Sequence, residues 1–142
     1  MPHYQLLENI AIADIAFEAY GTTLEKVFEH AAEAIFDMMA DVKKIKPAKK
    51  YILKFNNENL ENLLFDFLNE IIYLKDTKYS IFKTVTVKIT HRKKYYLTAA
   101  LTGEKINPEK HELGNDIKAI TMHQFSLKQQ GKQWVARVVV DI

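Results

Sequence analysis

The sequence predicts a single α+β domain spanning residues 1–142, in which two amphipathic helices pack on one face of a largely antiparallel β-sheet. Three observations support this fold class. A chain of 142 residues with 48% hydrophobic residues can bury one substantial core. Apolar residues recur at helical spacing in two segments of the first half. In the second half they alternate with polar residues, in strands that pair as two hairpins.

The first predicted elements are a strand over residues 10–20 and a helix after it. Alternation along the strand places Asp14 among apolar residues. Gly21 ends the strand, and Thr22 with Glu25 forms a capping box that starts the helix. The helix continues to about residue 40 on an apolar stripe that we assign to the core, namely Leu24, Val27, Phe28, Ala31, Ala34, Ile35, Met38 and Met39.

A basic segment over residues 41–50 follows this helix and carries five lysines around Pro47. We interpret it as a solvated connection, with contact to RNA or a protein partner as the alternative. Residues 51–55 form a short predicted strand, and the Asn-rich turn after it caps a second helix that continues to about Lys75. The stripe of this helix consists of Leu60, Leu63, Leu64, Phe67, Leu68, Ile71 and Ile72.

The last four predicted strands form two hairpins. The pairing segments are residues 81–89 with 95–105, and residues 117–128 with 132–142. A loop containing His111 joins the two hairpins. We expect His123, in the second hairpin, to be a hydrogen-bonded structural histidine. Alternation does not predict the order of the strands in the sheet.

Composition excludes several classes of protein. The absence of cysteine excludes disulfides, thiolate zinc sites and thiol catalysis, and the five histidines show no close metal-ligand spacing. The net charge of +2 is too small to imply a nucleic-acid partner. No apolar run approaches the roughly 20 residues of a membrane span, and no phosphate-binding loop or nucleophile elbow occurs. We therefore expect a cytoplasmic protein with neither a membrane nor DNA as its partner.

Two acids lie on strand faces whose other residues are mostly apolar. Asp14 is in the first strand, and Asp141 ends the last one, beside Ile142 with its main-chain and carboxylate oxygens. If the strand ends meet, the carboxylates repel one another until a proton or a cation relieves the repulsion. Oxygen-only ligands favour a hard cation, Ca²⁺ or Mg²⁺. The alternative is a pair of sheet-edge acids in water or paired with Lys or Arg. Lys118, between apolar residues, is a third candidate, against the alternative of an ordinary outward-facing lysine.

Several short motifs together resemble the archease family, in the same order along essentially the whole chain. They are Ala13-Asp14-Ile15-Ala16, Tyr20-Gly21, Thr23-Leu24-Glu25, Phe28, Leu63-Leu64, Phe67-Leu68-Asn69-Glu70, Gly103-Glu104, Lys110-His111, Ile117-Lys118-Ala119-Ile120-Thr121-Met122-His123 and Asp141-Ile142. No single motif is specific, but their order and spacing together are.

The resemblance implies an accessory protein of the RtcB-type tRNA-splicing RNA ligase, which joins RNA ends with GTP and manganese. It implies promotion of ligase guanylylation and of multiple turnover, with no ligase chemistry of its own and with tRNA as an indirect partner. It also implies a divalent-metal site of Asp14, Asp141 and Ile142, for Ca²⁺ or Mg²⁺ with Mn²⁺ as a further option. Lys118 matches the family lysine that is important for activity, and Asp41 is a weaker candidate for a further acidic role.

Two positions depart from the family pattern. Ala11 and Ile12 stand where the family usually has His and Thr, so any role of those side chains beside the metal is absent here. Asn59 opens the second helix where the family often has an acid. The residues also leave two other functions open. One is an RNA-binding module or RNA chaperone that uses Lys43 to Lys50 without the ligase. The other, a metal-dependent hydrolase, is disfavoured because no evident base or nucleophile accompanies the acids.

Overall fold

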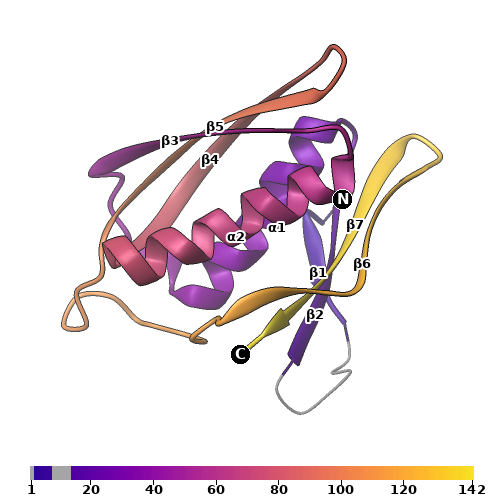
Figure 1. The fold of residues 1–142 in the computed structure, drawn as a ribbon. Helices are drawn as coiled ribbons and strands as arrows, with labels where there is room; N and C mark the ends of the chain where they lie inside the picture. Colours follow the sequence, from indigo (N-terminus) through magenta and orange to yellow (C-terminus); the bar gives the residue numbers. More distant parts are fainter. Residues whose placement is uncertain (1, 8–13) are drawn as a thin grey trace.

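The computed structural model describes residues 2–7 and 14–142, and in these residues the chain forms two α-helices, one short 3₁₀ helix and seven strands (Figure 1). The elements are β1 (Tyr4–Leu6), β2 (Asp14–Gly21), α1 (Leu24–Met39), η1 (Val42–Lys44), β3 (Lys49–Asn57), α2 (Leu60–Lys78), β4 (Ser80–His91), β5 (Tyr95–Lys105), β6 (Ala119–Gln130) and β7 (Gln133–Asp141). The α+β class is confirmed.

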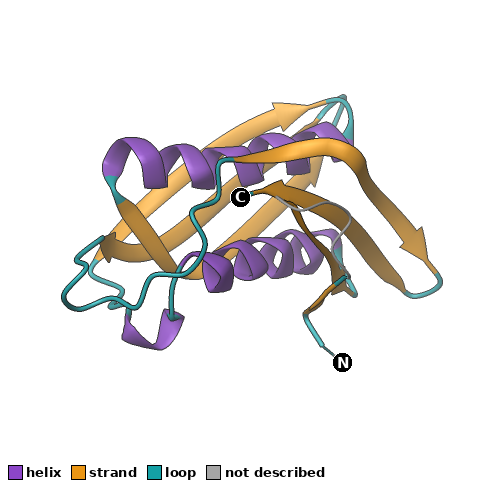
Figure 2. Ribbon diagram, turned by 90° about the horizontal axis from the view of Figure 1, so that it is seen from below, coloured by secondary structure: helices purple, strands orange, loops and turns teal. Residues whose placement is uncertain are grey.

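The strands divide into two antiparallel sheets instead of the one sheet that we expected. The first sheet has the order β1-β2-β7-β6, and the second has the order β3-β5-β4. Each predicted hairpin forms, but in a different sheet. The helices lie between the sheets, and each contacts strands of both (Figure 1). Figure 2 shows the same layers from below.

Both helices begin at capping side chains and bury their apolar stripes. Thr23, one residue later than predicted, accepts a hydrogen bond from the Lys26 N–H at 3.1 Å, and Asn59 caps α2 in the same way. The methionines and phenylalanines of α1 are buried, as expected for core residues. Phe28 and Phe67 join the two helices, with ring centroids 6.0 Å apart. Because α1 lies between two sheets, residues on most of its circumference are buried.

Several strand boundaries differ from the predictions. β1 was not predicted, and it pairs with β2 at the sheet edge. The predicted strand over residues 10–20 is confirmed from Asp14 onward, while residues 10–13 lie outside the described part of the chain. β6 begins at Ala119, so Lys118 comes immediately before the strand. His123, expected to be a hydrogen-bonded structural residue, is exposed.

The helices are too polar or too short for a membrane. Among the described residues, no helix has the length and hydropathy that crossing a bilayer requires.

Candidate functional site

The pairing register of β2 and β7 places Asp14 directly opposite Asp141. Residues that face each other in an antiparallel pair have Cβ atoms about 4.5–5.5 Å apart, and their side chains lie on the same face of the sheet. Both acids are partly buried. The next pair on this face, Ala16 and Val139, is fully buried. The two carboxylates, 127 positions apart in sequence, therefore share one largely apolar corner of the sheet.

Lys118 reaches the same corner from the other side of β7. Its backbone N–H donates a 2.8 Å hydrogen bond to the Asp141 carbonyl, and Ala119 is the register partner of Asp141. Its side chain is exposed. Ile142 follows directly and packs against the core. The structure thus brings together all four residues that the sequence analysis singled out for the site.

The acids of this corner form no ion pair with a basic side chain in the part of the chain that the structure describes. Like charges directly opposite on a sheet destabilise the pairing. A divalent cation between the carboxylates would remove this repulsion, and an all-oxygen donor set suits Ca²⁺ or Mg²⁺. Ala11 and Ile12, the two departures in the first motif, lie outside the described residues.

Helix α2 holds the segment that carries Lys118. The buried ammonium group of Lys75 donates to Asp116 Oδ1 at 2.7 Å and to the Ile117 carbonyl at 2.8 Å. Its hydrogen bond and its positive charge lower the pKa of the Asp116 carboxyl. Two turns earlier, the Asn69 side-chain oxygen accepts a longer bond, 3.4 Å, from the Ile120 N–H. The helix therefore contacts the backbone on both sides of Lys118.

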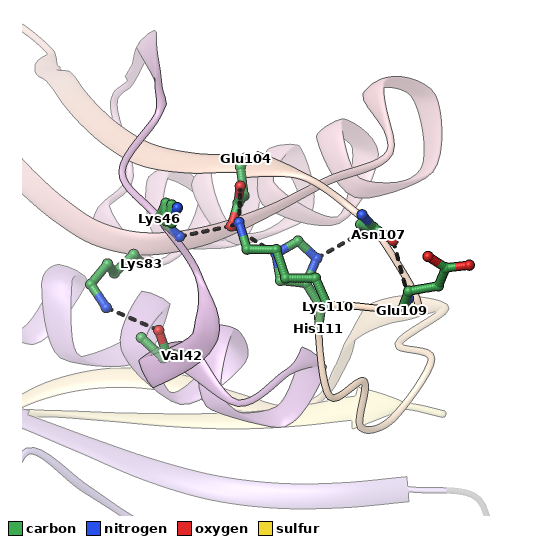
Figure 3. A network of polar contacts seen from close by, with 8 residues as sticks. All are labelled: Val42, Lys46, Lys83, Glu104, Asn107, Glu109, Lys110 and His111. Atoms are coloured by element: carbon green, nitrogen blue, oxygen red, sulfur yellow. Dashed lines mark hydrogen bonds and ion pairs between the residues drawn. The ribbon is translucent and has the colours of Figure 1, made fainter.

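A second polar network anchors the loop between β5 and Lys118 (Figure 3). His111 is buried, and its Nδ1 accepts from the Asn107 N–H at 2.9 Å, so its Nε2 carries the proton that it donates to Glu104 at 2.7 Å. Hydrogen bonds from Lys110, His111 and the Lys46 N–H lower the pKa of the Glu104 carboxyl to about 2. Every polar atom of the His111 ring is satisfied, which indicates a structural role for this pair.

The remaining sequence candidates lie elsewhere. The Asp41 side chain caps η1 by accepting from the Lys43 N–H at 3.1 Å, which accounts for its presence structurally. The lysines of the basic segment are exposed, as expected for a solvated connection. Lys44 forms a 3.2 Å ion pair with Glu112.

Sequence reasoning missed one cluster, formed by His3, His30 and Glu33. One candidate ligand atom from each of these residues lies within 4.8 Å of the other two. Close spacing between histidines does not indicate this cluster, because His3 precedes β1 and His30 lies in α1. The signal that could have indicated the cluster is the His-x-x-Glu spacing at positions 30 and 33, which places both side chains on one helix face.

Comparison with known proteins identifies relatives along the whole chain. The model of the Archease protein family matches residues 4–142. The chain is 40% identical to Protein archease of Pyrococcus furiosus over 132 residues, covering 92% of this chain and 93% of the relative. It is 38% identical to Protein archease of Methanosarcina mazei over 141 residues, covering 98% and 95%.

Two solved structures share the fold. The solution structure of Methanobacterium thermoautotrophicum protein 1598 superposes with a TM-score of 0.84 at 30% identity, covering 100% of both chains. The crystal structure described as an archease, possible chaperone, from Thermotoga maritima superposes with a TM-score of 0.64 at 22% identity, covering 97% of this chain and 98% of that one. The second comparison concerns the fold alone.

Proposed function

Because the chain belongs to the archease family, we propose that it is an accessory activator of an RtcB-type RNA ligase in tRNA splicing and RNA repair. It promotes guanylylation of the ligase and its multiple turnover, and has no ligase chemistry of its own. The observation that carries the proposal is the register of β2 and β7, which sets Asp14 opposite Asp141 beside Lys118. The strand-face pattern of the sequence and the family resemblance single out the same three residues.

Asp14 and Asp141 hold a divalent cation in this proposal, with an oxygen of Ile142 as a further ligand. The donors are hard oxygens, which fits Ca²⁺ or Mg²⁺, with Mn²⁺ as a further option. When bound, the cation neutralises the two opposed carboxylates and fixes the ends of β2 and β7 against each other. The surface offered to the ligase then has one defined shape at this corner.

Lys118 provides the positive charge that meets a phosphate or an acidic group of the ligase. Its exposed side chain is free to reach a partner, while its backbone is held by the bond to the Asp141 carbonyl. Because this bond joins Lys118 to the metal-binding strand, occupancy of the metal site and the position of the lysine are coupled.

Guanylylation and multiple-turnover ligation by the cognate ligase, each measured with and without this protein, test the proposal. We expect strong stimulation by the parent and a large loss of it in Asp14→Asn, Asp141→Asn and Lys118→Ala. Metal binding, measured by calorimetry with Ca²⁺, Mg²⁺ and Mn²⁺, should be lost in both aspartate variants and retained in Lys118→Ala.

Matched controls separate the site from general effects of charge. Lys128→Ala removes an exposed lysine near the far end of β6, the strand that Lys118 immediately precedes, and Glu58→Gln neutralises an exposed acid before α2. Both should stimulate the ligase like the parent. Folded Asp14, Asp141 and Lys118 variants that all retain full stimulation would refute the proposal.

One observation favours an alternative function, RNA binding without the ligase. The side chains of Lys43, Lys46, Lys49 and Lys50 are all exposed and could contact phosphates. This alternative predicts salt-dependent RNA binding by the protein alone, measured by filter binding between about 50 and 200 mM salt. If no RNA is retained even at the lowest salt, this alternative is wrong.

A further inference from the structure

We propose that His3, His30 and Glu33 form a second metal site, for a transition-metal dication of the zinc type. Two imidazoles with one carboxylate are a typical donor set for Zn²⁺ and related ions, and differ from the all-oxygen set of the Asp14 corner. The site therefore goes beyond the proposed function. The three side chains are among those that line a pocket of about 360 Å³, so a metal held by them keeps a coordination position open to the pocket.

The ring orientation of His30 is already set for metal binding. Its Nδ1 lies 2.5 Å from the Tyr20 carbonyl oxygen. A carbonyl can only accept, so Nδ1 carries the proton and the lone pair is on Nε2. Metal-bound histidines usually donate their other ring N–H to a carbonyl or carboxylate in this way, which fixes the tautomer and the orientation of the ring.

The backbone of Tyr20 also positions His3. The Tyr20 N–H donates a 2.8 Å hydrogen bond to the His3 carbonyl, in the pairing of β1 with β2. The two imidazole rings stack with centroids 3.7 Å apart and planes 8° from parallel. One residue of β2 thus holds both histidines, with its N–H on one side and its carbonyl on the other.

Glu33 supplies the anionic ligand. It lies three residues after His30 on α1, on the same helix face, and its Oε2 is 2.7 Å from His3 Nδ1. The neighbouring acid in the pocket, Glu29, already accepts from Lys26 and from the Val87 N–H. Of these two acids, Glu33 is the one that contacts a histidine, and a metal ion could take the place of that contact.

Binding requires a small rearrangement of the exposed side chain. Ligand atoms on one tetrahedral zinc are about 3.3 Å apart at Zn–N distances of about 2.0–2.1 Å. The three candidate atoms, within 4.8 Å of one another, must therefore move inward by about an ångström. His3 is 56% exposed and can turn, while His30 is held by its carbonyl bond. The metal would therefore open the stacked pair of rings by moving His3.

The two proposed metal sites are well separated. Asp14 is the first residue of β2, and Tyr20 is near its end. Six residues at about 3.3 Å each put the sites about 20 Å apart along the strand. Loss of one site should therefore leave the other intact, and the two proposals can fail separately.

Zinc titration of the tag-free, chelator-stripped protein, followed by competition with a chromophoric chelator, tests the proposal. A polyhistidine tag must be removed because it binds the same ions. We expect one Zn²⁺ per chain, at least about tenfold weaker binding in His3→Ala and in Glu33→Gln, and unchanged binding in His123→Ala, which removes an exposed histidine of β6. Zinc should also shift the NMR signals of the His3 and His30 rings and leave those of His123 unmoved.

Two variants keep the test decisive. His3→Ala and Glu33→Gln alter side chains that are 56% and 36% exposed, so folding should survive, and far-UV circular dichroism without metal checks this. Asp141→Asn should bind zinc like the parent. The proposal is overturned if the tag-free parent shows no saturable zinc binding. It is equally overturned if binding survives His3→Ala and Glu33→Gln, or disappears in Asp141→Asn.

Discussion

Replacing Lys75 by Met should loosen the segment before β6 without disturbing the core around it. The Lys75 side chain is 9% exposed, so its methylene stem packs in the interior. Met keeps most of this apolar volume and removes the ammonium group. The Ile117 carbonyl then loses its donor, and Asp116 loses its ion pair.

The expected destabilisation follows mainly from these two contacts, because the further ion pair of Lys75, with Asp76 at 3.1 Å, involves an acid that is 55% exposed. A buried acceptor left without its donor costs about 1–3 kcal/mol. Asp116 is 86% exposed, so its ion pair contributes at most about 1 kcal/mol after solvent screening. Relief of the buried charge offsets part of the loss. We expect a net cost of about 1–3 kcal/mol. For 142 residues the unfolding entropy is about 0.3 kcal/mol/K, so Tm should fall by about 3 °C for each kcal/mol.

Urea unfolding and calorimetry of Lys75→Met measure this loss. The matched control is Lys78→Met, which removes an exposed lysine one turn later on the same helix. Amide exchange adds local information, because the Lys118 N–H bonded to the Asp141 carbonyl should exchange faster in Lys75→Met. Ligase stimulation should fall too, although Lys118 itself is unchanged. If Lys75→Met and Lys78→Met are equally stable and exchange alike, the proposed role of α2 in holding this segment is wrong.

Substitutions at three further positions test the packing and polar contacts of the fold. The folded-state pKa of Glu104 is lowered from 4.5 to about 2. The contribution of this carboxylate to stability is therefore complete above pH 4.5 and is lost as the pH falls through about 2. Urea unfolding across this range should show a weaker pH dependence in Glu104→Gln than in the parent. Gly103→Ala should cost at least about 2 kcal/mol in the same assay, because its Cβ would lie 2.0 Å from the Ile81 carbonyl oxygen. Glu29→Met should cost about 1–3 kcal/mol by leaving the Val87 N–H without an acceptor, and Glu29→Gln, which keeps an acceptor oxygen, should cost less.

The helices and hairpins were predictable because their signals are local. The apolar stripe of α1 repeats over 16 residues, and the β4–β5 turn joins strands that alternate cleanly. The apolar stripe stops at Ile72 and predicts an end of α2 at about Lys75. The helix nevertheless continues to Lys78 and stops where Tyr79 adopts a left-handed conformation with φ of 50°. No apolar periodicity marks this last turn.

The division into two sheets was not predictable from the same patterns. Alternation shows which face of a strand is buried, but not which strand lies beside it. The partner of β7 across the sheet is β2, far away in sequence, and β1 has only three residues, too few to show a period. The cluster of His3 with His30 depends on this edge pairing, because β1 must join β2 before His3 reaches α1. The spacing of His30 and Glu33 indicates two members of the cluster, but nothing in the sequence indicates that His3 joins them.

The candidate site exists because β7 lies in the interior of its sheet. A central strand pairs on both sides, so Asp141 has Asp14 as its neighbour on β2 and Ala119 on β6. Because side chains alternate strictly, a register slip of one residue would turn Asp141 to the face of β7 whose residues Val138 and Val140 belong to the main hydrophobic core. The packing of those valines in the main core therefore fixes the position of the acid. The apolar run that makes β7 a strand is also what sets the carboxylates opposite each other, so core substitutions in β7 should alter metal binding without touching a ligand.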